Sequence, residues 1–429
     1  MSRRRYTMLL LGLVLLVVLL MPLIMLPGSL SQDAEGKEWL WAPHPSQEEE
    51  PSYRQLDVTV SMTEEEVKAL QVLSDRFAAQ HPGTEVQIRN LPYIDSYEQL
   101  RSEAAMRELT DIILLESGWV QEFAARGYLD PLDDLFTAES LADHLAPLLQ
   151  QVKWNGYIWG MPLDGNPYIT VWSRALLEEA GRLEPPADWA ELVLLTDELR
   201  QYERQGSDPL AWVAADNAGL AWISWLAALQ AGAAADNLQE QLILPEEVWQ
   251  FLSLAMADNR IRLSPTSEAG PLATELIQGE LLSSVMPWTV YLEAAQQGSG
   301  EQLLLAMDGD RLLMPGGRSY VVADTARDKE LAHAWIAAVA SPEAQREAWQ
   351  RQGSLPARSS LYSIVHADST VKLPEWLYEA LAGQPLWPPD PHLQSHLSGY
   401  EALSLAWAGG AYTGDEYRES WEKRLLNFD

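Results

Sequence analysis

Residues 56–115 alternate between strand-like and helix-like segments, and this alternation limits the fold more than any other feature of the chain. Residues 56–60 alternate and contain β-branched side chains, which indicates a strand. Thr63 and Glu66 then have the spacing of a capping box, so a helix is expected to begin there. Residues 111–115 (DIILL) form a continuous apolar run, which is typical of a strand buried on both faces. This order predicts an α/β fold with a largely parallel sheet.

A candidate binding site follows the buried strand. Ligands of open α/β sheets bind beyond the carboxyl ends of the strands, and residues 116–119 (Glu-Ser-Gly-Trp) occupy that position here. Ser117 next to Trp119 offers a hydrogen-bonding group beside a flat apolar face. The alternative is an ordinary strand-to-helix turn in which Ser117 is the N-cap. The local sequence does not separate these two interpretations.

The N-terminus has the pattern of an export signal or a membrane anchor. Three arginines at residues 3–5 precede an apolar run of 19 residues at 8–26, which is about the length of a membrane-spanning helix. The positive-inside rule would place the rest of the chain outside the cytoplasm. Cleavage near Ser29 or Ser31 is the alternative. Residues 31–55 are rich in proline and glutamate and predict a linker.

The composition excludes several classes of partner and site. With 62 acidic against 29 basic residues, the net charge of −33 repels nucleic acid and anionic membrane surfaces. The chain has no cysteine, so disulfides, thiolate metal sites and cysteine nucleophiles are excluded. It has 18 tryptophans, which serve either as core side chains or as stacking faces for sugar rings. The spacing of His392 and His396 suits a metal, but no third ligand is evident, so no metal and no cofactor are expected.

Five segments resemble, in the same order, the family 1 extracellular solute-binding proteins of the maltose-binding-like branch. They are residues 56–90, 111–136, 154–181, 279–288 and 316–345. The resemblance implies the two-lobed periplasmic-binding-protein fold of type II, with a ligand cleft between α/β lobes that hinge crossovers join. The lipid-attachment cysteine of many such proteins is absent, which favours retention of the apolar N-terminal helix as the anchor.

The resemblance also implies the lobe boundaries. The N-terminal lobe is expected to contain residues 56–162 and 286–330. The C-terminal lobe is expected to contain residues 163–285 and 331–429. The chain would therefore cross between the lobes more than once.

By position in the family pattern, eight residues are expected to contact the ligand. They are Ser117, Trp119, Asp164, Asn166, Tyr168, Trp288, Gly317 and Arg318. Several of them also have a structural interpretation. Asp164 and Asn166 lie in an Asp-Gly-Asn-Pro turn sequence, Trp288 suits a core, and Arg318 suits an internal salt bridge.

The expected function is that of a monomeric, extracytoplasmic binding protein attached to the membrane by its N-terminal segment. It would deliver a small polar ligand, a sugar or oligosaccharide, to the permease of an ABC transporter. No local motif singles out a catalytic pair among the acidic residues, so an enzyme is not expected. The alternative is a membrane-anchored sensor or surface scaffold on the same fold.

Overall fold

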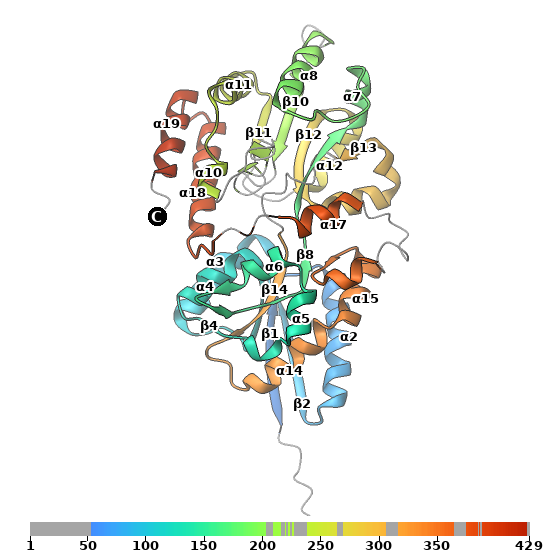
Figure 1. Cartoon of the computed structure of the whole chain (residues 1–429), viewed down its shortest axis with the longest axis vertical. Helices are drawn as coiled ribbons and strands as arrows, with labels where there is room; N and C mark the ends of the chain where they lie inside the picture. Colours follow the sequence, from blue (N-terminus) through green and yellow to red (C-terminus); the bar gives the residue numbers. More distant parts are fainter. Residues whose placement is uncertain are drawn as a thin grey trace, which may run out of the picture. The chain divides into compact units, whose positions relative to one another are not determined.

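A computed structural model of the chain arranges its strands in two main sheets (Figure 1). The structure describes residues 53–202, 209–215, 219, 222–223, 225–226, 238–263, 269–305, 316–363, 375–384, 386 and 388–426. The predicted apolar helix at residues 8–26 and nearly all of the predicted linker lie outside this part of the chain. Among the described helices, none combines the length and apolar character that crossing a bilayer requires.

The first sheet is six-stranded, in the order β2-β1-β3-β14-β4 with β7 also paired to β14. β1 is parallel to β2 and β3, whereas β14 is antiparallel to its neighbours. The strands are β1 (Arg54–Val60), β2 (Thr84–Asn90), β3 (Ile112–Glu116), β4 (Leu129–Asp130), β7 (Met161–Pro162) and β14 (Arg318–Ala323). β1 begins at Arg54, so the predicted linker extends two residues too far.

The prediction that residues 111–115 form a strand buried on both faces is confirmed for β3. Ile112 and Leu114 belong to one apolar core, with β1 and Trp335. Ile113 and Leu115 belong to a second core on the other face. Successive side chains of a strand point to opposite faces, so a continuous apolar run is stable only where helices cover both.

The second sheet is five-stranded, in the order β11-β10-β12-β9-β13. β10 is parallel to β11 and β12, and β9 runs antiparallel between β12 and β13. The strands are β9 (Tyr168–Ser173), β10 (Ala211–Ala215), β11 (Ile261–Leu263), β12 (Leu281–Pro287) and β13 (Leu303–Leu305). Two apolar cores cover its faces, and much of the tryptophan content is buried there, including Trp222 and Trp421.

Helices flank both sheets (Figure 1). The helices that follow or precede strands of the first sheet are α2 (Glu64–Gln80), α3 (Tyr93–Met106), α4 (Val120–Ala125), α5 (Ala138–Asp143), α6 (Ala146–Gln151), α14 (Lys329–Val339) and α15 (Pro342–Gln352), with the 3-10 turn η1 (Ser117–Trp119). The remaining described helices are α7 (Arg174–Glu179), α8 (Trp189–Tyr202), α10 (Leu238–Gln241), α11 (Glu246–Ala257), α12 (Ala269–Gln278), α13 (Trp288–Ala294), α17 (Glu375–Ala382), α18 (Leu393–Ala408) and α19 (Gly414–Leu425). The predicted capping box of α2 is present, with Thr63 and Glu66 bonded in both directions.

Two of the predicted lobe segments are divided between the two sheets. Residues 286–330 were expected to belong with the first sheet, but β13 pairs with β9 of the second. Residues 331–429 were expected to belong with the second sheet, but α14 buries Leu331 and Trp335 in the same core as β1. The reason is chain order: α14 directly follows β14, and its apolar face covers the nearest exposed side of the first sheet.

Short antiparallel strands lie where the chain passes between the sheets. β8 (Asp164–Gly165) follows β7 of the first sheet, precedes β9 of the second, and pairs with β15 (Leu355–Pro356). The chain returns to the first sheet between β13 and β14. A separate hairpin joins β5 (Lys153–Trp154) and β6 (Tyr157–Ile158). Residues around β8 and the start of β14 therefore lie beside both sheets, which is where the candidate site is found.

Candidate functional site

A pocket with a volume of about 1390 Å³ is lined by residues from both sheets and from the segment between them. The first sheet contributes the ends of β2 and β3, the residues that follow β1, and the first turns of the helices after these strands. The second contributes β9, β12, α12 and α13. Ligand pockets of drug-sized molecules measure roughly 300–1,000 Å³, so this pocket has room for more than a monosaccharide.

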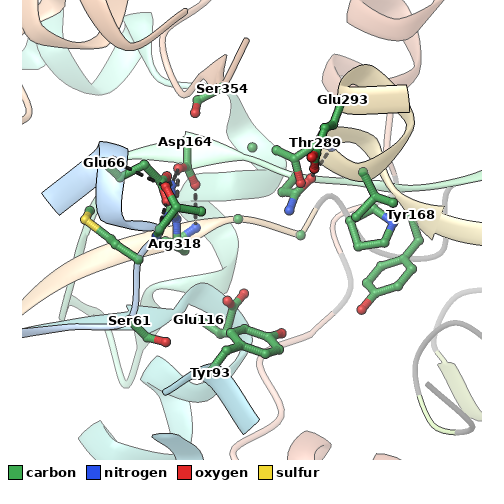
Figure 2. A pocket seen from close by; sticks show the side chains of 18 of the residues that line it. Ser61, Glu66, Tyr93, Glu116, Asp164, Tyr168, Thr289, Glu293, Arg318 and Ser354 are labelled. Carbon is green, nitrogen blue, oxygen red and sulfur yellow. Dashed lines mark hydrogen bonds and ion pairs between the residues drawn. The ribbon is translucent and has the colours of Figure 1, made fainter. Parts of the chain in front are cut away.

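Arg318 lies at the centre of a buried ion-pair triad in the pocket wall (Figure 2). Its backbone N–H and its Nε donate to the Asp164 carboxylate over 2.9 and 3.0 Å, and its guanidinium also binds Glu66 at 2.7 Å. The side chains of Asp164, Glu66 and Arg318 are only 6%, 14% and 19% exposed. The triad therefore joins the start of β14, the crossover strand β8 and the first turn of α2.

The triad favours the ionised forms of Glu66 and Arg318. Burial opposes ionisation of Glu66, but the Arg318 charge and hydrogen bonds from Arg318 and Thr63 outweigh it and lower the pKa of Glu66. Burial also opposes the charged form of Arg318, yet the two carboxylates raise its pKa well above the usual value. The hydrogen bonds and ion pairs of these three side chains thus hold the crossover in place, and the three groups are directed at one another rather than at the pocket.

Glu116, the last residue of β3, behaves differently. Burial, opposed by Arg318 and reinforced by Asp164, raises the pKa of its carboxyl to about 7. Within the described part of the chain, no side chain or backbone N–H donates a hydrogen bond to this carboxyl. In Figure 2 the Glu116 carboxylate points into the open pocket, while those of Glu66 and Asp164 point at Arg318. Glu116 is therefore an acidic group that a ligand can engage directly.

Gly316 and Gly317 let two backbone segments approach closely in the pocket wall. Their φ angles are +58° and +117°, in the region that side chains disfavour. A Cβ on Gly316 would lie 2.2 Å from the Asn166 carbonyl oxygen, and one on Gly317 would lie 2.1 Å from the Asp164 carbonyl oxygen. Glycine is thus required where the return strand passes the crossover, and Gly317 contributes backbone rather than a side chain.

The structure brings together six of the eight predicted contact residues in the pocket lining. They are Trp119, Asp164, Asn166, Tyr168, Gly317 and Arg318. The prediction of an internal salt bridge for Arg318 is confirmed. The Asn166 side chain accepts a hydrogen bond from the backbone N–H of Thr289 and so holds the first turn of α13. Contact of these six residues with a ligand remains a prediction.

Ser117 and Trp288 do not line the pocket, which corrects the expectation that both face a ligand. Ser117 is fully buried, and its hydroxyl bonds to that of Ser319 on β14 at 2.8 Å. Trp288 is also fully buried in an apolar core, and its indole N–H donates to the Gly353 carbonyl. An indole with its only donor satisfied inside the protein has no face left for a sugar.

Other lining residues were not singled out by the sequence. Glu66 and Tyr93 begin the helices that follow β1 and β2, so the strand-end rule applied to β3 also locates them. Glu116 lies at the predicted strand end, but the sequence does not decide whether it or Ser117 faces the pocket. Glu293 and Glu401 lie on α13 and α18, far along the chain, and no local pattern marks them.

No group of three or more potential metal ligands occurs among the described residues, and the His392 and His396 rings lie 6.5 Å apart. The side chains that line the pocket instead offer carboxylates, amides, hydroxyls and aromatic faces. Such groups bind a polar organic ligand through hydrogen bonds at its rim and contacts with its apolar faces.

Known proteins with a similar sequence are solute-binding or binding proteins. Residues 73–375 match the bacterial extracellular solute-binding proteins. A binding protein of Brucella abortus strain 2308 is 24% identical over 116 residues, but this stretch is only 27% of the chain and 28% of that relative.

Solved structures cover more of the chain at low identity. Maltose-bound MalE3 of T. maritima matches 87% of this chain and all of its own, with 19% identity and a TM-score of 0.68. The ABC substrate-binding protein Lmo0181 of Listeria monocytogenes, in complex with cycloalternan, matches 88% of this chain and 98% of its own, with 16% identity and a TM-score of 0.68. At these identities the likeness establishes the fold, the two-sheet α/β architecture of MalE.

Proposed function

Since the chain belongs to the bacterial extracellular solute-binding protein family, we propose that it captures a saccharide in the pocket between its sheets and delivers it to an ABC permease. The observation that carries the proposal is the pocket of about 1390 Å³, whose lining combines aromatic residues with hydrogen-bonding groups. Structural relatives hold maltose and cycloalternan, and both are saccharides. The pocket volume favours an oligosaccharide over a single sugar ring.

The residues of the pocket suit this ligand class. Tyr93, Trp119 and Tyr168 offer aromatic faces, and apolar C–H faces of sugar rings pack against such surfaces. Amide and carboxylate oxygens accept hydrogen bonds from the hydroxyl groups at the rim. Closure of the two α/β units around β8 and the start of β14 would remove water from both sets of contacts and give the permease a closed form to recognise.

The protein works outside the cytoplasm, as a monomer, with the apolar segment at residues 8–26 holding it at the outer face of the membrane. A 19-residue apolar run after three arginines supports this topology. The acidic composition supports a small-molecule ligand and disfavours nucleic acid.

A thermal-shift screen tests the proposal. The panel contains maltose, maltotriose, cellotriose, mannitol and the common amino acids. A ligand present at about 100 times its Kd stabilises the native state by about 2.7 kcal/mol, which raises the melting temperature by several degrees. A shift with a saccharide that Tyr93→Ala abolishes supports the proposal. A shift with amino acids alone overturns the saccharide assignment. The absence of any shift favours a sensor or scaffold that has lost ligand binding.

A further inference from the structure

The pocket carries a large excess of negative charge. Its lining contains seven carboxyl groups against two arginines. The carboxyls are those of Glu64, Glu65, Glu66, Glu116, Asp164, Glu293 and Glu401, and the arginines are Arg318 and Arg351. Arg318 is already bound by two carboxylates, and Arg351 pairs with Glu347 at 3.6 Å. Neither arginine is therefore available to neutralise the others, and an anionic ligand would be repelled.

The Glu116 carboxyl accepts no hydrogen bond among the described residues and shares the Arg318 charge with two other carboxyls. The charged groups around it are Arg318 on β14, Asp164 on β8 and Glu66 on α2, with Glu401 of α18 in the same pocket lining. The one cation among them is shared by Asp164 and Glu66, so Glu116 adds a third carboxyl to a single guanidinium. Burial also raises the pKa of Glu401 on α18, so this second carboxyl of the pocket is likewise harder to ionise than an exposed one.

Aromatic faces lie in the same lining. Tyr93 is half exposed, and Trp119 and Tyr168 also contribute to the pocket surface. Aromatic rings attract cations through the negative potential of their faces, by about 0.5–2 kcal/mol for each well-placed pair. An uncompensated carboxylate among aromatic rings is a combination that binds an ammonium group in preference to a hydroxyl.

We propose that the ligand of this pocket is a saccharide bearing a protonated amine, and that the Glu116 carboxylate binds its ammonium group. The inference rests on the proposed saccharide-binding function and narrows its ligand class. An ammonium group would supply the counter-charge that Glu116 lacks and would form charge-assisted hydrogen bonds, which are roughly twice as strong as neutral ones. A neutral sugar would leave that carboxyl without an ionic partner in a partly buried site.

Calorimetric titration with matched ligand pairs tests the proposal. The pairs are cellotriose with the glucosamine trimer, which share the β-1,4 backbone, and glucose with 6-amino-6-deoxyglucose. At pH 7.5 the amino member of each pair is expected to bind at least tenfold more tightly than the neutral member. Glu116→Gln is expected to remove this preference, so that the two members of each pair bind with similar affinity. The full-length protein in detergent is used throughout.

Glu293→Gln is the matched control, because it removes one negative charge from the pocket on α13 while leaving Glu116 in place. It is expected to keep most of the preference for the amine. If the two variants lose the preference equally, the general field of the pocket and not Glu116 selects the amine, and the assignment to Glu116 fails.

The remaining outcomes separate this inference from the proposed function. Equal or tighter binding of the neutral members overturns the inference and leaves saccharide binding intact. If spermidine binds as tightly as the glucosamine trimer and with the same dependence on Glu116, the assignment of an amine ligand stands and the assignment of a saccharide fails. Failure of every saccharide, neutral or amino, overturns both.

The pH dependence gives an independent readout. An ammonium group binds the ionised form of Glu116, so its affinity falls when that carboxyl takes up a proton. For 6-amino-6-deoxyglucose, whose amine stays protonated, the affinity is expected to fall on the order of tenfold between pH 7.5 and 5.5. The fall is expected to be absent in Glu116→Gln. The same fall in that variant would assign the titration to another group and overturn the role of Glu116.

Discussion

Arg318 binds Asp164 through its backbone N–H and its guanidinium, and this pair joins two of the chain segments that link the sheets. Asp164 forms part of the outgoing crossover strand β8, and Arg318 begins the returning strand β14. Their side chains are 6% and 19% exposed. The pair thus fixes the relative position of both crossovers at the wall of the pocket.

Asp164→Asn is expected to lower the free energy of unfolding by about 3 kcal/mol at pH 7.5, since removal of one partner leaves a buried charge poorly compensated. Urea denaturation measures the change. Asp324→Asn is the matched control, because Asp324 pairs with the mostly exposed Arg107 and such surface pairs contribute about 0–1 kcal/mol. An equal decrease in the free energy of unfolding in the two variants would show that the buried pair of Asp164 and Arg318 stabilises the fold no more than a surface pair does.

Gly317→Ala is expected to destabilise the protein by more than about 2 kcal/mol, because the new Cβ would lie 2.1 Å from the Asp164 carbonyl oxygen at a φ of +117°. Gly127→Ala serves as the control: its φ is +72°, but no atom lies within 4 Å of the new Cβ. That variant should lose only about 1 kcal/mol, the cost of the backbone conformation. Thermal unfolding of both proteins provides the comparison.

Glu116→Gln is expected to raise the free energy of unfolding at pH 7.5, by roughly 1–3 kcal/mol. The folded-state pKa of about 7 lies above the ordinary value of 4.5. Between these values the folded protein binds the proton that the unfolded chain has released, so the wild type gains stability relative to the variant as the pH falls. The advantage of the variant should therefore be largest above pH 7 and vanish near pH 4.5.

Denaturation curves of both proteins at pH 7.5, 6.0 and 4.5 measure this difference. The comparison between the two proteins matters, since Glu66 and Asp111 have lowered pKa values and weaken both as the pH falls further. A constant difference between wild type and variant at all three pH values would contradict the raised pKa of Glu116.

Trp119→Ala and Trp288→Ala are expected to separate binding from stability. Trp119 lines the pocket, so Trp119→Ala should lower the affinity for a saccharide on the order of tenfold. The saccharide measured is the one that gives the largest thermal shift with the wild type. Trp288 is fully buried and away from the lining, so its loss should cost about 3–5 kcal/mol of folding free energy. Calorimetry and urea denaturation of both variants measure the two effects. Full stability together with lost binding in Trp288→Ala would contradict its placement in the core.

Much of the fold could be predicted from local sequence because it depends on periodicity. The apolar run at residues 111–115 predicts a strand covered on both faces, and β3 contributes to two cores. The spacing of Thr63 and Glu66 predicts the capping box that begins α2. These features depend on neighbours within a few residues, and they need no knowledge of where the rest of the chain lies.

The candidate site could be predicted only in part, because the direction of a side chain depends on contacts with distant parts of the chain. The strand-end rule located residues 116–119, and the family resemblance located the crossover loop; both segments line the pocket in part. It did not decide which side chain faces inward: Glu116 faces the pocket, whereas Ser117 turns to Ser319 in the interior. Trp288 suited a stacking role by its position in the family pattern, yet the Gly353 carbonyl and the surrounding core hold it inside.

By itself the sequence determined the α/β class, the alternation of strand and helix over residues 56–115, and the acidic character of the chain, because these depend on local pattern and composition. Only the tertiary structure decided the partners of Arg318, which lie 154 and 252 positions away along the chain. It also decided that, among the described residues, Asp164 and Glu66 form ion pairs with Arg318 whereas Glu116 only shares the field of that charge. Long-range pairing sets the local dielectric environment and the charge balance, and no short stretch of sequence contains either.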